Sequence, residues 1–298
     1  LPENTFEVYI NEDITNEPVE HARRAARAAA EHFQSISLLA VSSGLSTDGD
    51  SIIAGIQQEL GTAVELAGGM AGDDLKMEKT MVFSADAQSD RGLCLLIFDA
   101  SRLQMRSLAA SGWQAVGIAK TITHSRGNHV FTLDGEPMLD VYKKYFGMDE
   151  VNLARRVVEV GIHYPLQVLR EDGPPLLRAP LIGNRDDRSV VFAGSLPEGS
   201  KVKMSIPAGA QITESLLDAY QELHDEIPSA DAILLFSCVG RSNALGPLME
   251  EEIARIHDVW KVPTVGFFTY GEIGRALGDV CNFHNETCVL VLMRELAP

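Results

Sequence analysis

Hydrophobic residues follow two periods along the chain, and the two periods predict different elements. Short apolar runs bounded by turn residues predict strands, at residues 6–10, 36–41, 64–67, 81–84, 93–98, 105–110, 130–133, 190–193, 202–206, 233–236, 262–268 and 287–293. Helical spacing predicts helices at residues 18–33, 51–60, 138–146, 212–224 and 245–259. In the second helix, Asp50 is placed to cap the first turn and Gly61 to end the last one. Residues 150–173 show neither period clearly, and we expect them to be less regular.

The order of these elements predicts an α/β fold. Closely spaced short strands joined by turns favour antiparallel pairing, whereas strand–helix–strand units favour parallel pairing. We therefore expect a two-lobed α/β protein with mixed, largely antiparallel sheets flanked by helices, with one domain at residues 1–136 and a second at 137–298. The segments ISLLAVSSG and VELAGGMAGD are echoed later by AILLFSCVG and VPTVGFFTYGE, which is compatible with an internal duplication.

Composition indicates the compartment and excludes several classes of partner. The chain has 298 residues, 45% of them hydrophobic, and a net charge of −17, so a nucleic-acid backbone or an anionic membrane would be repelled. It contains no run of about 18 apolar residues that would suggest a membrane span. Its cysteines are Cys94, Cys238, Cys281 and Cys288, and none forms a CxxC pair. We interpret them as small buried hydrophobes of a protein in the reducing cytoplasm.

Two strand ends carry the residues best suited to a ligand site. The strand at 233–236 leads into a turn of small residues at 237–241, and the strand at 262–268 is interrupted at Gly266 and ends in TYGE. Loops at strand ends of α/β folds are where ligands bind. The sequence therefore predicts a cleft lined by both strand ends, with a glycine-rich segment opposite. Its residues are Cys238, Gly240, Arg241, Tyr270, Gly271 and Glu272, with Gly69 and Asp73 facing them.

Each candidate side chain has a structural interpretation beside the functional one. Arg241 either holds a ligand carboxylate or phosphate through two parallel hydrogen bonds, or forms a salt bridge with Glu272. Asp73 either binds a ligand amine or caps a turn. The Glu272 carboxylate beside the Tyr270 hydroxyl suits recognition of an ammonium group. Burial explains Cys238 better than nucleophilic chemistry does, although a neighbouring Arg241 guanidinium would lower its pKa and favour the thiolate.

The remaining motifs indicate no catalytic or metal centre. The GGMAG segment at 68–72 lacks the lysine of a phosphate-binding loop. The sequence shows no Ser–His or Cys–His pairing and no HxH or HExxH spacing. His284 offers an imidazole to a metal or a haem iron, but a lone histidine more often makes a structural hydrogen bond. We therefore expect no catalytic residue and no metal site.

Three motifs resemble the C-terminal domain of the FIST (F-box and intracellular signal transduction) sensory family: FSCVGR at 236–241, VGFFTYGEIG at 265–274 and HNETCVLVL at 284–292. The segments AGGMAGD at 67–73, SGWQAVG at 111–117 and LDGEPMLDVYKKYFG at 133–147 resemble the stretch that joins the two domains of that family. The likeness runs from about residue 38 onward. The family's N-terminal domain usually begins with a further α/β stretch that is not recognised here, so we expect a shortened N-terminal part.

The resemblance implies a non-enzymatic sensory input module that binds a small polar molecule, with amino acids as the proposed ligands. The implied partner is a signalling protein such as a histidine kinase or a cyclase. Some similar proteins bind haem and sense nitric oxide, and on that alternative His284 is the first axial candidate, with Cys238 or Tyr270 after it. An enzyme that uses Cys238 as its nucleophile is the third hypothesis. Haem is the only cofactor that the resemblance brings in.

Overall fold

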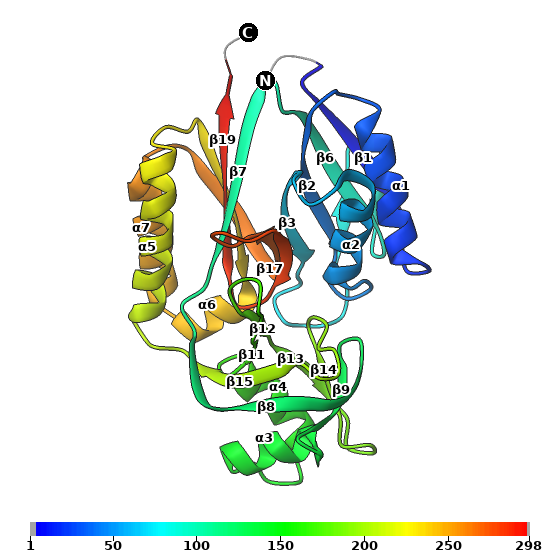
Figure 1. Cartoon of the computed structure of the whole chain (residues 1–298), viewed down its shortest axis with the longest axis vertical. Coiled ribbons are helices and arrows are strands. Elements are labelled where there is room, and N and C mark those ends of the chain that lie inside the picture. Colours follow the sequence, from blue (N-terminus) through cyan, green and yellow to red (C-terminus); the bar gives the residue numbers. More distant parts are fainter. Residues whose placement is uncertain (1–3, 297–298) are drawn as a thin grey trace.

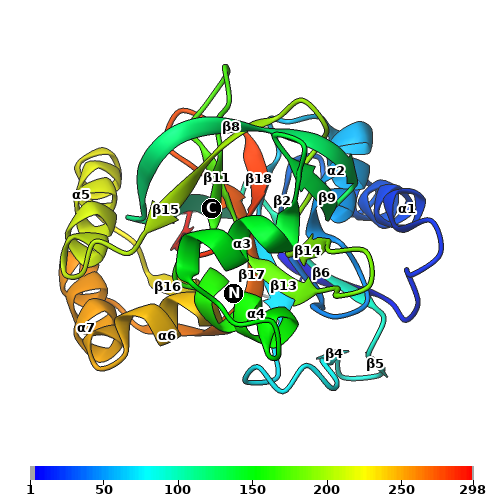
Figure 2. The same ribbon diagram turned by 90° about the horizontal axis from the view of Figure 1, so that it is seen from below.

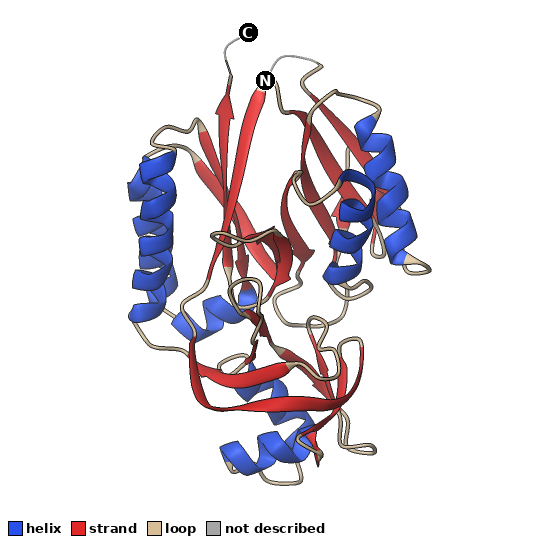
Figure 3. Ribbon diagram, viewed as in Figure 1, coloured by secondary structure: helices blue, strands red, loops and turns tan. Residues whose placement is uncertain are grey.

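The computed structural model describes residues 4–296 and arranges them in two lobes, each built around its own sheet (Figures 1 and 3). The upper lobe in Figure 1 holds a nine-stranded sheet with the order β1-β6-β2-β3-β17-β16-β19-β7, and β18 pairs with β17. Its strands are β1 (Phe6–Asn11), β2 (Ile36–Ser43), β3 (Glu65–Ala71), β6 (Leu93–Asp99), β7 (Leu103–Ala110), β16 (Ala232–Cys238), β17 (Thr264–Arg275), β18 (Cys281–His284) and β19 (Cys288–Glu295).

Two pairs of helices cover opposite sides of the upper lobe. The helices α1 (Pro18–Ala30) and α2 (Gly49–Leu60) lie on one side, and α5 (Gln211–Glu226) and α7 (Leu248–Trp260) on the other, with the strands between them (Figure 1). The two pairs pack on the sheet through separate apolar clusters, and the cluster of α1 and α2 also includes Ile273 of β17 and Phe283 of β18. A further cluster joins residues of both halves, among them Leu39 and Phe98 with Phe236 and Val289. The sheet therefore bends so that its two halves also pack against each other.

The lower lobe is formed by a single excursion of the chain between β7 and α5. Its eight-stranded sheet has the order β12-β11-β15-β8-β9-β14-β13, and β10 pairs with β9. The strands are β8 (Gln114–Arg126), β9 (His129–Leu133), β10 (Glu136–Pro137), β11 (Leu166–Val168), β12 (Leu176–Arg178), β13 (Pro180–Gly183), β14 (Val190–Phe192) and β15 (Lys201–Ile206). Seen from below in Figure 2, β8 curves across this lobe, and α3 (Met138–Phe146) and α4 (Leu153–Gly161) lie beneath the upper sheet. Their apolar faces share one core with the lower sheet.

The strand pairing of the upper lobe repeats itself about its centre. In the first half, β2 and β3 are parallel neighbours and β6 is antiparallel to β2. In the second half, β16 and β17 are parallel neighbours and β19 is antiparallel to β16. The two halves meet where β3 pairs antiparallel with β17. The echo in the sequence thus corresponds to two units of the same strand order. Apart from these two parallel pairs, the paired strands are antiparallel, which confirms the expected mixed, largely antiparallel α/β fold.

Several local expectations were wrong. The strand β17 runs without interruption through Gly266 to Arg275, and the expected turn after β16 is the start of a helix, α6 (Val239–Leu245). The side chain that caps α2 is Asp48, which accepts a hydrogen bond from the Asp50 N–H at 3.1 Å. The sequence analysis missed the 13-residue strand β8 and the helix α4. The strands β4 (Val82–Phe83) and β5 (Gln88–Ser89) pair only with each other and form a small separate ribbon. The two domains expected at residues 1–136 and 137–298 stay a prediction; the lower lobe contains strands from both ranges, because β9 pairs with β14 and β8 with β15.

Candidate ligand site between the two lobes

Three chain segments of the upper lobe meet directly above the lower lobe. The parallel pairing of β16 and β17 places Cys238 beside Thr269, so that both strands reach the same edge of the sheet. The chain turns from β16 into α6 there, β17 continues through Tyr270, and the turn between β18 and β19 adds Asn285 and Glu286. Carboxyl ends of parallel strands are the usual position of ligand sites in α/β sheets.

A cavity of about 410 Å³ lies between this edge and the lower lobe, and we call it the interlobe cavity. From the upper lobe it is lined by Cys238, Val239, Gly240, Tyr270, Asn285 and Glu286, and by Leu75 and Met77 of a loop. From the lower lobe it is lined by Ala179, Pro180, Leu181 and Ala193, by Arg155, Val158 and Glu159 of α4, and by Ile162, which follows that helix. Its size is within the range of cavities that hold small organic ligands.

Glu286 is the polar residue that distinguishes this cavity. Its side chain is 1% exposed, and its Oε2 atom has no hydrogen-bond partner within residues 4–296. The carboxyl group lies over Gly240, where a Cβ atom would come within 2.3 Å of Oε1, so only glycine leaves it room. Burial, reinforced by the nearby Glu272 carboxyl, raises the pKa of Glu286 well above its ordinary value. The cavity thus contains a buried acid that lacks a partner.

Glu272 lies next to Glu286 and is fully satisfied. It is completely buried and accepts hydrogen bonds from the hydroxyls of Thr269 at 2.6 Å and Thr287 at 2.8 Å. Burial raises its pKa to about 8, in spite of these bonds. Glu272 is therefore placed behind the cavity wall, where it adds a second acidic group close to Glu286.

The thiol of Cys238 is protonated in this environment. Burial raises its pKa well above the ordinary value, and the carboxyls of Glu272 and Glu286 raise it further. The expectation that Arg241 would lower this pKa is wrong, because two acids rather than a guanidinium face the sulfur atom. Nucleophilic cysteines need the thiolate form, so the geometry gives no support to a Cys238 nucleophile.

Arg241 is part of a buried ion pair outside the cavity. Its side chain and that of Glu252 are both 0% exposed, and the guanidinium donates to the two carboxylate oxygens at 2.9 and 2.6 Å. It also donates to the carbonyl of Ser111 at 3.0 Å and lies 5.7 Å from the ring centre of Trp113. The expected salt bridge with Glu272 is therefore wrong, and Arg241 does not line the interlobe cavity.

Tyr270 and Asp73 order the loop that closes one side of the cavity. The Tyr270 hydroxyl donates to Asp73 and accepts from the Leu75 N–H at 2.7 Å. Asp73 accepts further bonds from the N–H groups of Met77, Glu78 and Lys79. Partial burial opposes ionisation of Asp73, but these bonds outweigh it and hold its pKa at about 2. Of the two interpretations offered for Asp73, the structure shows the turn-capping one.

Of the three glycines predicted for the site, Gly240 lines the cavity, whereas Gly69 and Gly271 contribute close packing and do not line it. A Cβ atom at Gly69 would approach Thr269 to 2.6 Å, across the pairing of β3 with β17. A Cβ atom at Gly271 would come within 2.2 Å of the Phe283 ring. Gly69 therefore lets β3 lie close to Thr269 of β17, and Gly271 leaves room for the Phe283 ring.

A second cavity, of about 660 Å³, opens on the other side of Tyr270. It is lined mainly by apolar side chains, including Val41, Met81, Phe267 and Phe268. Its lining contains no buried polar atom that lacks a partner in the described part of the chain. For this reason we regard the interlobe cavity as the better candidate.

His284 does not fit a haem ligand. The ring is 4% exposed, and its Nε2–H donates to the carbonyl of Gly274 at 3.0 Å. Burial lowers its pKa to about 4. The lining of the interlobe cavity does not include it, so haem coordination would require this bond to break and the surrounding core to open. Across residues 4–296, no group of three or more His, Cys, Asp or Glu side chains is arranged to hold a metal ion.

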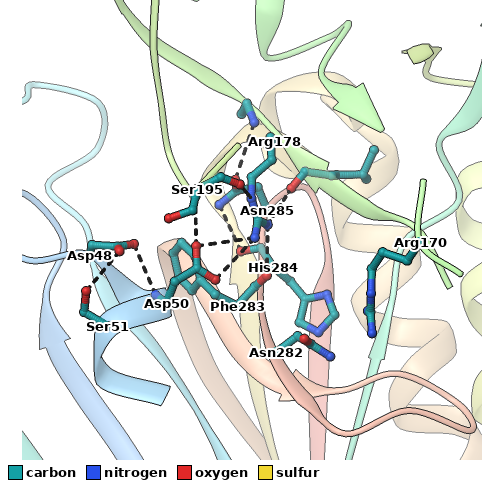
Figure 4. Close-up of polar contacts among 12 residues, drawn as sticks. Asp48, Asp50, Ser51, Arg170, Arg178, Ser195, Asn282, Phe283, His284 and Asn285 are labelled. Carbon is teal, nitrogen blue, oxygen red and sulfur yellow. Dashed lines mark hydrogen bonds and ion pairs between the residues drawn. The ribbon is translucent and has the colours of Figure 1, made fainter. Parts of the chain in front are cut away.

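A buried polar network connects the two lobes beside the cavity (Figure 4). Arg178 at the end of β12 is 3% exposed and donates to the carbonyl of Phe283 on β18 at 3.0 Å. It also contacts the Asp50 carboxylate of α2 at 3.3 Å, and Asp50 accepts the Ser195 N–H at 2.8 Å (Figure 4). Asp50 thus links α2 to the lower lobe, in place of the capping function that we expected.

A second ion pair continues the connection between the lobes. Arg170 of the lower lobe donates to Asp279, which precedes β18, at 2.6 and 3.0 Å. The Ala179 N–H donates to the Asn285 side chain at 3.4 Å, directly at the cavity. The lower lobe is therefore held to the upper one by contacts on both sides of the cavity residues Ala179 and Asn285.

Sequence reasoning placed Cys238, Gly240 and Tyr270 at one cavity but missed Asn285 and Glu286. The signal was present, since the HNET segment ends one strand and begins the next. A glutamate in such a turn is ordinarily expected to be exposed to solvent. Its φ angle of 54° and its burial follow from the packing of the turn beneath the sheet edge, which no local pattern shows.

Two family models match the chain. The FIST N domain matches residues 4–136, and the FIST C domain matches residues 139–275. No curated protein matches the chain. None of the helices in the described part of the chain is both long and apolar enough to span a membrane.

Proposed function

Because the chain belongs to the FIST family, whose domains are generally sensory, ligand-binding signal transduction domains, we propose that it is a non-enzymatic sensor of a small molecule. The ligand binds in the interlobe cavity. Its presence changes how the two lobes pack, and a signalling partner such as a histidine kinase or a cyclase detects the change.

One observation carries the proposal. The interlobe cavity has the volume of a small-molecule site, and its lining includes the buried Glu286, whose Oε2 atom has no hydrogen-bond partner within residues 4–296. Leaving such a group unsatisfied costs about 1–3 kcal/mol. Unpaired buried polar groups are rare in folded proteins and mark places where a ligand or an ordered water completes the structure. A ligand that bonds to Glu286 removes this cost.

The position of the cavity explains how binding can be transmitted. Its walls belong to both lobes, so a ligand that fills it contacts Leu181 on β13 and Tyr270 on β17 together. The same lower-lobe segment carries Arg178, whose contacts with Asp50 and Phe283 join the lobes. A ligand that contacts both walls stabilises one packing of the lobes over others, and a population shift of this kind is sufficient for signalling.

A pair of substitutions on one strand tests the location. Leu181 lines the cavity, whereas the next residue, Ile182, does not line it and is 55% exposed. In a thermal-shift screen with a panel of small polar and amphipathic molecules, Leu181→Trp is expected to abolish the shift caused by any ligand that stabilises the wild-type protein. Ile182→Trp is expected to retain it. Equal responses from the two variants would show that the ligand binds elsewhere.

A further inference from the structure

We propose that the interlobe cavity binds an organic cation, a primary amine with an apolar body and no α-carboxylate, and that Glu286 receives its ammonium group. The proposal rests on the proposed function, since it specifies the ligand of the same cavity. It names a chemical class that the side chains of the cavity recognise.

The acidic groups at the cavity have no free basic partner among the described residues. Glu286 lines the cavity and Glu272 lies directly behind it. The nearest guanidinium, that of Arg241, is fully engaged by Glu252 and by the carbonyl of Ser111. A cation that enters the cavity therefore competes with no other free cationic group of residues 4–296 for the Glu286 carboxyl.

Hydrogen bonding leads to the same conclusion. The side-chain amide of Asn285 already donates to the carbonyl of His284 and accepts from Ala179, and the Tyr270 hydroxyl is taken by Asp73 and Leu75. By contrast, the Oε2 atom of Glu286 has no hydrogen-bond partner within residues 4–296. An ammonium group brings three donors and forms short, charge-assisted bonds to a carboxylate, which are about twice as strong as neutral ones.

The remaining walls suit an apolar body. Leu75 and Met77 close the cavity from the loop, Val158 of α4 and the following Ile162 close it from below, and Leu181 closes it from β13. Aliphatic or aromatic groups of a ligand would be removed from water against these side chains, which favours binding. The cavity thus combines one acidic position with an apolar enclosure.

An α-amino acid fits this arrangement less well than the corresponding amine. Its carboxylate is attached to the carbon that bears the ammonium group, so it would lie beside Glu286 and Glu272. The only basic residue of the lining is Arg155, whose side chain is 83% exposed and pairs with Glu159 at 3.0 Å. That guanidinium is at the mouth of the cavity, whereas Glu286 is at its buried end. The α-carboxylate would therefore meet like charge.

Amine binding also moves a proton. In the empty cavity Glu286 is neutral, because burial and the Glu272 carboxyl disfavour its ionised form. A bound ammonium favours the carboxylate, so the Glu286 proton passes to solvent while the amine keeps its own three. The other ionisable groups around Glu286 are the thiol of Cys238, the Arg241–Glu252 pair, Tyr270 with Asp73, and Arg155 with Glu159 at the mouth.

Isothermal titration calorimetry with three matched probes tests the proposal: phenethylamine, 2-phenylethanol and phenylalanine. They share one apolar body and differ in the ammonium and carboxylate groups. Phenethylamine is expected to bind at least about 10-fold more tightly than the other two, and titrations in phosphate and in Tris should show a proton released. Glu286→Gln, which keeps the shape of the side chain, is expected to weaken phenethylamine binding about 10-fold or more.

The control variant is Glu222→Gln, an exposed position on α5 far from the cavity lining, and it should keep the wild-type affinity. Equal binding of the alcohol, or tighter binding of phenylalanine, overturns the amine assignment and leaves the sensor function standing. Absence of binding by all three probes at millimolar concentration also overturns it. The proposed function fails separately, if no molecule of the wider panel distinguishes Leu181→Trp from Ile182→Trp.

Discussion

Replacing Arg241 by methionine is expected to destabilise the protein strongly, because it leaves the partner carboxylate buried and unpaired. Arg241 and Glu252 are both 0% exposed, and after the substitution only the hydroxyl of Thr213, at 2.8 Å, would still bond to Glu252. Breaking a buried ion pair by removing one partner costs about 3–5 kcal/mol. For a domain of roughly 150–250 residues this corresponds to a fall in Tm of about 2–4 °C per kcal/mol.

The double variant Arg241→Met/Glu252→Met separates the charge from the packing. When both members of a buried pair become apolar at similar volume, stability is often unchanged or increases, by about 1–4 kcal/mol. The double variant is therefore expected to be more stable than Arg241→Met alone. The lost bond to the Ser111 carbonyl and the lost contact with Trp113 keep it from a full recovery.

Urea unfolding followed by tryptophan fluorescence measures both variants. The chain has two tryptophans, and one of them, Trp113, lies 5.7 Å from the Arg241 guanidinium carbon, so the signal reports the affected region. If Arg241→Met unfolds within about 1 kcal/mol of the wild-type protein, the pair is not the structural element described here. A selective loss of ligand affinity in a stable Arg241→Met variant would restore the ligand-binding interpretation of this residue.

Three further predictions concern Glu272, Tyr270 and Asp50. The pKa of Glu272 in the folded protein, about 8, exceeds its ordinary value of 4.5, so between these values the native state keeps a proton that the unfolded state has released. Stability therefore falls as pH rises from about 4.5 to about 8. In thermal melts across this range, Glu272→Gln should make Tm depend less on pH, and an unchanged slope would refute the assignment. Tyr270→Phe removes the hydroxyl that bonds Asp73 and Leu75, so amide exchange and proteolysis should increase in the loop at 73–79 while the sheet stays protected. Asp50→Asn weakens the contact with Arg178, and the backbone amide of Ser195, which donates to Asp50, should then exchange faster, with a larger increase than for the amides of β16. Equal protection of the Ser195 amide in Asp50→Asn and in the wild-type protein would mean that this network does not hold the lobes.

Much of the fold follows from local patterns, and the failures have physical causes. The apolar runs that became β2 and β16 are buried on both faces and therefore read clearly as strands. By contrast, β8 is largely exposed along its length and carries polar residues, so it shows no apolar run. Its pairing with β15 and β9 holds it as a strand. The helix α6 begins at the residue after β16, with no polar cap or spacer to mark the change.

The site was predicted in part, because the strand ends that carry it are visible in the sequence whereas the partners of each side chain are not. Cys238, Gly240 and Tyr270 meet at the interlobe cavity as the strand order suggested. The partner of Arg241 is Glu252, which stands on the following helix α7 among other acidic residues and has no distinguishing spacing. Glu286 became identifiable only when its burial and its unpaired oxygen were known.

A crystal structure of the protein with phenethylamine is the most direct measurement of the central claim. The account predicts the ligand between the two lobes, with its nitrogen about 2.7–2.9 Å from Oε2 of Glu286 and its ring against the apolar side chains of the loop and α4. A ligand bound instead in the second cavity beside Phe267 and Phe268, or one whose nitrogen has no contact with Glu286, would contradict it.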